Sequence, residues 1–277
     1  MMLCETPILQ VENMTVRYGA GCAHCGEHME KNRCTLCGTI WAVRDLSLTV
    51  YPGEVLGVVG ESGSGKSTLM QSLYFDTQPT EGRAYLAGFG EGKRDLWQAS
   101  SAEKRDIKNR LMGMVYQNPT LGLRMDYSAA ANIAEKLIAA GERDAGKMTA
   151  RVTELLEAVE ILTSRMGEAP KHFSGGMQQR VQISKALANN PALLLLDEVT
   201  TGLDLSVQAK VLDLIRRIRA RYGVSILLVS HDLAVIRMLA DRTIVMLDGC
   251  IVESGLTDQI LEDPQHAYTQ QLVHSLL

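Results

Sequence analysis

The chain of 277 residues is 46% apolar and carries a formal net charge of −4, so it can bury a sizeable core, and its acidic balance argues against a nucleic-acid-binding surface. No apolar run approaches the roughly 18 residues that a membrane span needs. The first seven residues lack the basic patch and apolar core of a signal peptide, so we expect a cytoplasmic protein, in which disulfides are disfavoured.

An edge strand is the first expected element, because residues 8–18 alternate apolar and polar side chains. A Gly- and Cys-rich insertion at residues 19–40 interrupts this sheet. Residues 41–59 return to strand character, with a turn at Pro52-Gly53 before a short buried strand. The pattern of the first 59 residues therefore predicts β-strands on both sides of an insertion.

The insertion contains two C-x-x-C-G motifs, at residues 22–26 and 34–38. Each C-x-x-C turn directs two thiolates to one point, and four thiolates make the closed tetrahedral site that suits structural Zn²⁺. A segment of about 22 residues without a core needs such a metal to fold. An iron–sulfur cluster, mononuclear iron and metal-free thiols are weaker alternatives, and His24 and His28 are possible substitute ligands. The expected zinc ligands are Cys22, Cys25, Cys34 and Cys37.

The next segment, GESGSGKS at residues 60–67, matches the phosphate-binding pattern G-x-x-x-x-G-K-[ST] in full. It follows the apolar run 54–59 and precedes a helix-like segment, which makes a plain Gly/Ser surface turn the weaker reading. The glycines let backbone N–H groups and the helix N-terminus face an anion. We expect Lys66 to reach the β- and γ-phosphates and Ser67 to hold Mg²⁺. The expected nucleotide contacts in this loop are Gly60, Ser62, Gly63, Gly65, Lys66, Ser67 and Thr68.

The middle of the chain is more helical. The charged stretch 90–110 predicts a loop and an exposed helix, and residues 127–173, rich in Ala, Glu and Leu, show helical periodicity. We place a small helical subdomain at residues 119–174. From residue 175 to residue 247 the expected helices and strands alternate, which is typical of a parallel α/β sheet.

One expected strand of this region ends in two acids, Leu193-Leu-Leu-Leu-Asp197-Glu198. A buried strand would place them at the carboxyl edge of the sheet, where ligands bind in open α/β folds. We expect Asp197 to hold Mg²⁺ through Ser67 and water, and Glu198 to orient and deprotonate an attacking water. Two adjacent acids are weak evidence alone, but they become strong evidence about 130 residues after a phosphate loop.

The segment Ser174-Gly175-Gly176-Met177-Gln178, at the start of the next expected helix, resembles the signature motif of the ABC ATPase family. Other motifs of that family occur in order. Gln117 resembles the glutamine of the Q-loop, and Thr201-Gly-Leu-Asp204 resembles the D-loop. His231, at the end of another expected strand, resembles the switch histidine, and Tyr18 resembles the aromatic residue that stacks on adenine.

The resemblance covers nearly the whole chain and implies one ABC ATPase domain over residues 1–277. Its expected fold is α/β: a P-loop nucleotide-binding domain with a helical subdomain, an antiparallel β subdomain and the zinc-ribbon-like insertion. The chain departs from the family pattern at Val199, where proline is usual, and at Met177, where glutamine is usual. The insertion at 19–40 is a further departure from the family pattern.

The resemblance implies a Mg²⁺-dependent ATPase that works as a head-to-tail dimer, either of two copies or with a different ABC subunit. Each ATP would lie between the phosphate loop of one subunit and the signature motif of the other. The implied catalytic residues are Glu198, His231 and Gln117. The implied Mg²⁺ ligands are Ser67, Gln117 and Asp197. The implied further nucleotide contacts are Tyr18, Ser174, Gly175, Gly176 and Asp204.

Two subfamilies are similar to this chain. The ending Asp263–Gln270 resembles ATPase subunits of peptide and nickel importers, and equally the ATPase subunit of the bacterial carbon–phosphorus lyase system, which degrades phosphonates. Residues 122–124, 132–137 and 252–258 favour the second resemblance. It implies a soluble lyase complex as the partner, whereas the importer alternative implies a membrane partner.

Overall fold

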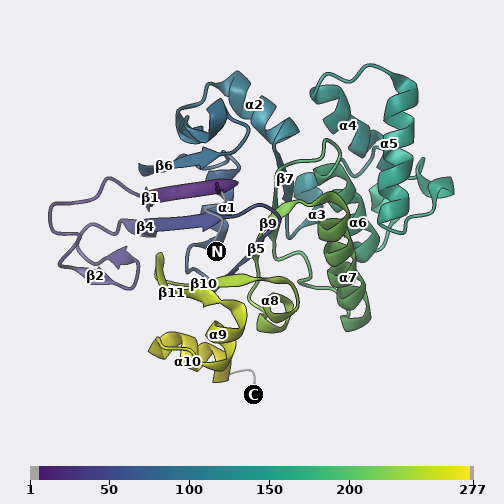
Figure 1. Ribbon diagram of the computed structural model, residues 1–277. Coiled ribbons are helices and arrows are strands. Elements are labelled where there is room, and N and C mark those ends of the chain that lie inside the picture. The colour runs from purple at the N-terminus through teal and green to yellow at the C-terminus, as the bar shows by residue number, and fades with distance from the viewer. Residues whose placement is uncertain (1–5, 275–277) are drawn as a thin grey trace. The chain divides into compact units, whose positions relative to one another are not determined.

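The computed structural model describes residues 6–274, which form two compact units. Unit 1 comprises the described residues up to Ala99 and those from Leu228 onward, and unit 2 comprises Ser100–Leu227. Each unit combines strands and helices (Figure 1). None of the helices between residues 6 and 274 has the length and apolar character that a membrane-crossing segment requires.

An antiparallel sheet forms one layer of unit 1, with the strand order β2-β3-β4-β1-β6 (Figure 1). Strand β1 (Leu9–Tyr18) pairs on one side with β4 (Ile40–Val50) and on the other with β6 (Glu81–Leu86). The expectation of an edge strand at residues 8–18 is therefore wrong. Alternation shows that one face of a strand is buried, but it does not show a second partner that comes from much later in the chain.

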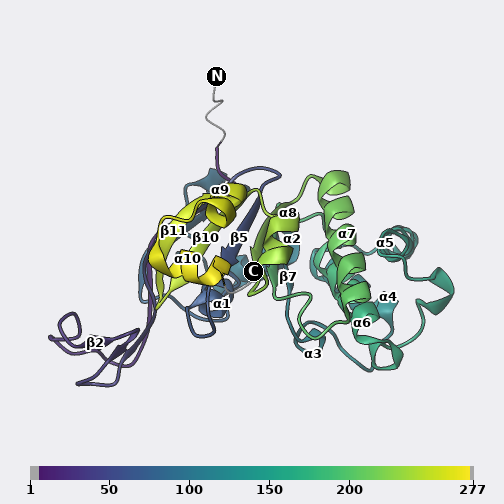
Figure 2. The ribbon, with the colours of Figure 1, turned by 90° about the horizontal axis from the view of Figure 1, so that it is seen from below.

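The cysteine-containing insertion forms a short hairpin at the outer end of this sheet. Strand β2 (Met29–Glu30) pairs with β3 (Arg33–Cys34), and Arg33 pairs with Ile40 at the start of β4. Figure 1 shows this hairpin beyond the ends of β1 and β4, and in Figure 2 the segment around β2 also protrudes. The insertion thus continues the sheet and does not simply loop out of it.

The rest of unit 1 includes the phosphate-binding segment, which lies between β5 and α1. The expected turn at Pro52-Gly53 is confirmed, and the expected buried strand follows it as β5, with every side chain buried. Strand β10 pairs parallel with β5 and antiparallel with β11. The remaining strands and α-helices of this unit are β5 (Val55–Val59), α1 (Lys66–Leu73), α8 (Leu233–Leu239), β10 (Arg242–Leu247), β11 (Cys250–Leu256), α9 (Thr257–Glu262) and α10 (Ala267–His274), and two short 3-10 helices lie at Gly90–Gly92 and Leu96–Gln98.

Unit 2 contains the parallel strand pair β7 and β8 and most of the longer helices (Figure 1). The first helix has a capping box, in which the side chains of Ser100 and Glu103 each accept from the backbone N–H of the other. Strand β9 (Ser225–Val229) crosses the boundary between the two units in the chain. The other strands and α-helices are α2 (Ser101–Arg110), β7 (Met112–Val115), α3 (Pro119–Gly122), α4 (Ala129–Ala139), α5 (Ala145–Ala158), α6 (Gly175–Ala186), β8 (Leu193–Asp197) and α7 (Leu205–Tyr222), and two short 3-10 helices lie at Thr163–Arg165 and Pro170–His172.

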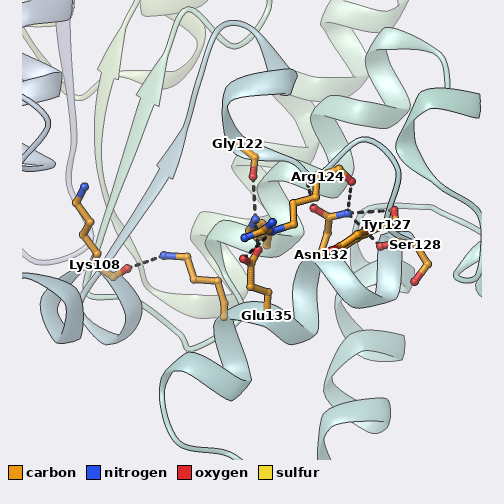
Figure 3. A network of polar contacts seen from close by, with 9 residues as sticks. Lys108, Gly122, Arg124, Tyr127, Ser128, Asn132 and Glu135 are labelled. Atoms are coloured by element: carbon orange, nitrogen blue, oxygen red, sulfur yellow. Dashed lines mark hydrogen bonds and ion pairs between the residues drawn. The ribbon is translucent and has the colours of Figure 1, made fainter.

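A polar network in unit 2 fixes the segment between α3 and α4 (Figure 3). The buried Asn132 side chain accepts from the backbone N–H of Arg124 (2.8 Å) and donates to three carbonyl groups, those of Arg124, Tyr127 and Ser128 (3.0, 3.3 and 3.1 Å). Each polar atom of this buried amide is thereby satisfied, which makes the turn before α4 a rigid one.

The same network ties α4 to α6 and α2. Glu135 accepts from Lys185 (2.7 Å) and from Arg124 (3.1 Å). The ammonium group of Lys136 donates to the Lys108 carbonyl (2.7 Å; Figure 3). Burial, and then the positive charges of Lys185 and Lys108, lower the pKa of Lys136 to about 8.

Candidate functional site

The phosphate-binding pattern forms a tight loop between β5 and α1. Gly60 and Gly65 have φ angles of 152° and 104°. A Cβ atom at Gly60 would lie 2.2 Å from the carbonyl oxygen of Met246, and one at Gly65 would lie 2.2 Å from that of Ala42. Both positions therefore exclude any side chain. The loop packs closely against β4 at Ala42 and against the end of β10 at Met246.

Lys66 lies over this loop and is only 6% exposed. Its ammonium group donates to the carbonyl oxygens of Gly60 and Glu61 (both 2.7 Å) and to the Ser64 hydroxyl (3.3 Å). Helix α1 begins at this residue, and Ser67 in its first turn is exposed. A fixed cation and a helix N-terminus meet in one loop, which is the arrangement that binds phosphate groups.

Tyr268 is a contact to this loop that the sequence did not reveal. Its hydroxyl accepts from the backbone N–H of Glu61 (2.8 Å). The Glu253 carboxylate holds the start of α10, because it accepts from the N–H groups of Gln265 (2.8 Å) and His266 (3.0 Å). Tyr268 lies within the ending Asp263–Gln270, whose pattern resembles two subfamilies equally but gave no sign of this contact.

Replacing Tyr268 by phenylalanine is expected to raise KM for ATP roughly two- to tenfold with little change in kcat, because one hydrogen bond to the loop is lost. Steady-state phosphate release checks this. Tyr51→Phe is the matched control. It removes the same hydroxyl group from an exposed tyrosine, whose ring lies against Arg242. Equal KM values for both variants and the native chain would rule out a role for the Tyr268 hydroxyl in positioning the loop.

Two further predicted site residues, His231 and Tyr18, belong to the same unit. Ser230 donates its N–H to the Val58 carbonyl (3.2 Å), so the exposed His231 follows directly on a segment that is bonded to β5. Tyr18 is the last residue of β1 and is 48% exposed, opposite Ile40. Its ring is thus accessible for stacking.

In unit 2 the structure brings together Gln117 and Glu198, which are 81 residues apart. The Gln117 side-chain amide donates to the Glu198 carboxylate (3.0 Å). Glu198 has a positive φ of 47°, and Thr201 donates its N–H to the Glu198 carbonyl (3.1 Å) and its hydroxyl to the carboxylate (3.3 Å). Asp197, the last residue of β8, is half-buried. The turn after β8 therefore aims the Glu198 carboxylate at Gln117.

Two buried glutamines of α6 support this pair, and no motif indicated them. The Gln182 side chain is 1% exposed, accepts from the Tyr116 N–H (2.6 Å) and donates to the Tyr116 carbonyl (3.1 Å). Gln179 donates to the same carbonyl (3.4 Å). Helix α6 thereby fixes the residue that precedes Gln117. A glutamine on a helix usually faces solvent, so sequence alone would assign both to the surface.

The signature-like motif lies at the start of α6. Ser174 is the N-cap and accepts from the Met177 N–H (3.4 Å), so the helix begins at Gly175. A Cβ atom at Gly176 would lie 2.4 Å from a methyl group of Val207, so no side chain fits there. Asp204 is exposed before α7, and the next residue, Leu205, is 85% exposed. Val199, at the usual proline position, is buried.

The four cysteines of the insertion form one cluster, as expected. Three of their Sγ···Sγ separations are 3.6 Å (Cys22–Cys25), 3.8 Å (Cys22–Cys34) and 3.5 Å (Cys25–Cys37), and all four sulfurs lie within 4.8 Å of one another. A tetrahedral Zn²⁺ with Zn–S distances of about 2.3 Å needs sulfurs about 3.8 Å apart, so the cluster fits this ion. His24 and His28 are exposed.

Two thiols of this cluster have pKa values shifted in opposite directions, lowered at Cys37 and raised at Cys22. Hydrogen bonds with Thr39, first through its side chain and then through its backbone, lower the pKa of Cys37 to about 6. A backbone hydrogen bond at His24 acts to lower the pKa of Cys22, but desolvation and hydrogen bonds with the neighbouring thiols raise it to about 12. Several thiolates so close together repel one another, and a bound divalent cation would offset that repulsion.

Comparison with known proteins shows that residues 43–201 match the family model described as ABC transporter. The chain is 43% identical over 271 residues to the phosphonates utilization ATP-binding protein PhnK of Escherichia coli (strain K12), with 98% of both chains covered. It is 41% identical to the methionine import ATP-binding protein MetN 1 of Pectobacterium atrosepticum, over 84% of this chain and 65% of that one. Identity to the oligopeptide transport ATP-binding protein OppD of Bacillus subtilis is 38%, over 87% and 68%.

Solved structures resemble the chain closely. The ATP-binding cassette MJ0796, solved as a dimer in a post-hydrolysis state with ADP and Pi, matches with a TM-score of 0.75 and 28% identity, over 90% of this chain and 98% of that one. The cbiO1 protein of Clostridium perfringens matches with a TM-score of 0.76 at 22% identity, over 94% and 92%. These likenesses confirm the fold class that the sequence predicted.

Proposed function

Because this chain belongs to the ABC transporter family, we propose that it binds ATP with Mg²⁺ and hydrolyses it to ADP and phosphate. The phosphate loop supports this most strongly, since Lys66 and the N-terminus of α1 are already arranged for phosphate groups. Glu198 orients and deprotonates the attacking water, while Gln117 and His231 complete the catalytic set. Ser67, Gln117 and Asp197 hold Mg²⁺, and Tyr18 stacks on adenine.

The working form is a head-to-tail dimer, of two copies or with another ABC subunit. The dimeric MJ0796 structure and the exposed Asp204-Leu205 at the start of α7 support this proposal. ATP bound by the phosphate loop of one subunit meets Ser174, Gly175 and Gly176 of the other, so each site is complete only in the dimer. Binding closes the pair, and hydrolysis releases it.

Mixing two inactive chains tests this composite site. Lys66→Ala disables every phosphate loop and Ser174→Arg every signature motif, so neither chain alone forms a complete site. A mixed dimer contains one intact site, and we expect trapped ATP and phosphate release to appear only on mixing. A Ser174→Arg chain that hydrolyses ATP alone at the native rate would contradict the proposal.

The partner we propose is a soluble phosphonate carbon–phosphorus lyase complex, on which ATP-driven opening and closing would act. The match to PhnK covers 98% of both chains, whereas the matches to MetN 1 and OppD cover only 65% and 68% of those proteins. The resemblance of residues 122–124 and 252–258 favours the same choice. The alternative is an ATPase subunit of a peptide- or nickel-type importer. The identities of 41% to MetN 1 and 38% to OppD support this alternative.

Mild affinity purification from the source cell distinguishes these partners. We expect the tagged native chain to bring down soluble lyase subunits, with more recovered from the ATP-trapped Glu198→Gln variant. Lys66→Ala is the control that should not show this ATP-dependent increase. Recovery of integral membrane proteins instead would favour the importer alternative.

The cysteine cluster, we further propose, holds one structural Zn²⁺ through Cys22, Cys25, Cys34 and Cys37. The Sγ separations of 3.5–3.8 Å support this ion. Four thiolates leave no open position, so the metal orders the hairpin and takes no part in hydrolysis.

A further inference from the structure

The tip of the cysteine hairpin contacts the phosphate loop. Asn32 lies in the turn between β2 and β3, and its side-chain amide donates to the carbonyl oxygen of Gly63 (3.4 Å), in the middle of the loop. The Asn32 carbonyl accepts from the Trp41 N–H (2.7 Å) at the start of β4. One residue of the insertion therefore bridges the loop and the neighbouring strand.

The cysteine cluster holds this turn in place. Cys34 follows it by two residues; its N–H donates to the Thr39 carbonyl (2.9 Å), and its carbonyl accepts from Gly38 (2.9 Å). Thr39 in turn accepts from the Gly21 N–H (3.0 Å) through its hydroxyl, which lies 3.2 Å from the Cys37 sulfur. The hydrogen bonds of the hairpin thus converge on the cluster.

No apolar core replaces the metal in this segment. Across residues 19–40, all of which the structure describes, the buried residues are Cys25, Cys34 and Thr39. So little burial does not offset the entropy of ordering about 22 residues. The position of Asn32 consequently depends on whether the thiolates share a metal.

A second contact to the loop comes from β4, directly after the insertion. The carbonyl of Ala42, three residues after Thr39, lies so close to Gly65 that a Cβ atom there would be 2.2 Å away. Strand β4 is held at this point by its pairing with β1, in which Trp41 lies opposite Arg17 and Val43 opposite Val16. The contact of the hairpin itself with the phosphate loop is therefore the one from Asn32 to Gly63.

We propose that zinc binding by the cysteine cluster sets the affinity of the phosphate loop for ATP, and that Asn32 is the positioning residue that couples the two. This rests on the proposed ATP-binding function and on the proposed zinc site. Asn32 contacts a loop carbonyl and not a reacting atom, so it acts on nucleotide binding and leaves the chemical step unchanged. Because coupling between two sites is reciprocal, bound ATP strengthens zinc binding by the same factor.

The test compares ATP affinity, by calorimetry with Mg²⁺, in the native chain, Asn32→Ala, Cys34→Ser with Cys37→Ser, and the triple variant. Asn32→Ala is expected to keep its zinc, to bind ATP roughly two- to tenfold more weakly and to retain kcat. The double variant should bind ATP at least as weakly. In the triple variant Asn32→Ala should have no further effect, because the turn is already released.

Two controls accompany this comparison. Glu27→Ala removes an exposed side chain of the same insertion that pairs only loosely with His24 (3.6 Å), and it should bind ATP as the native chain does. Asn32→Gln keeps an amide donor and should bind more tightly than Asn32→Ala. If the double variant does not fold, chelator treatment of the native chain followed by addition of a Zn²⁺ salt should lower and then restore the ATP affinity.

The possible failures are distinguishable. A native chain that does not bind ATP overturns the proposed ATPase function itself, and a native chain that contains no zinc overturns both the zinc site and the coupling. A native chain that binds ATP, with Asn32→Ala binding equally well, overturns only the coupling. The coupling is also overturned if Asn32→Ala weakens ATP binding by the same factor with and without zinc.

Discussion

Replacing Glu198 by glutamine is expected to lower ATP turnover by about 10²–10⁴-fold while ATP binding is retained. Glutamine keeps the shape of the side chain and its position beside Gln117, which lies 3.0 Å away, but it does not accept a proton from water. The chain should then remain in its ATP-bound dimer. Phosphate release measures the lost step, and sedimentation with ATP and Mg²⁺ measures the dimer.

Glu157→Gln is the matched control, since this glutamate lies exposed on α5. It should hydrolyse ATP at the native rate. Hydrolysis at normal rates by Glu198→Gln would remove Glu198 from the role of general base. A monomer that persists with bound ATP would show that the partner complex is needed to bring two subunits together.

The second large effect is expected at the cysteine cluster. Structural zinc sites in small peptides have apparent binding free energies of about 10–16 kcal/mol, and this energy folds the segment. Cys34→Ser with Cys37→Ser should therefore abolish the metal and leave residues 19–40 without hydrogen-exchange protection. Elemental analysis and hydrogen exchange measure the two losses.

Cys250→Ser is the matched control, because this cysteine lies on β11, outside the cluster, and accepts from the Arg44 guanidinium (3.3 Å). It should keep one zinc per chain. The assignment fails if the anaerobically purified native chain contains no zinc, or if visible absorbance reveals an iron cluster.

Local patterns in the sequence predicted the parts of this molecule that depend on neighbouring residues. The strand β5, the phosphate loop and α1 follow from an apolar run, glycines and a lysine within 20 residues. The thiol cluster follows from two C-x-x-C-G turns, since each brings two sulfurs together by itself. The Ser174 cap, and not the apolar period, sets the start of α6 at Gly175, so the apolar pattern alone does not fix where that helix begins.

Contacts between distant segments were not predictable in the same way. Tyr268 reaches Glu61 across 207 residues, and Asn32 reaches Gly63 across 31. Whether a side chain makes such a contact depends on how strands and helices pack, and a single sequence does not record that. The internal position of β1 went unrecognised for the same reason, because its second partner β6 comes from a distant part of the chain.

Calorimetric titration of ATP with Mg²⁺ into Glu198→Gln measures whether the phosphate loop of this chain binds ATP, the step on which the proposed function depends. We expect one ATP bound per chain, with binding strongly weakened when Lys66→Ala is added, because the proposed site places the charge of Lys66 at the phosphates. Absence of ATP binding to Glu198→Gln, or equal binding with and without Lys66, would contradict it.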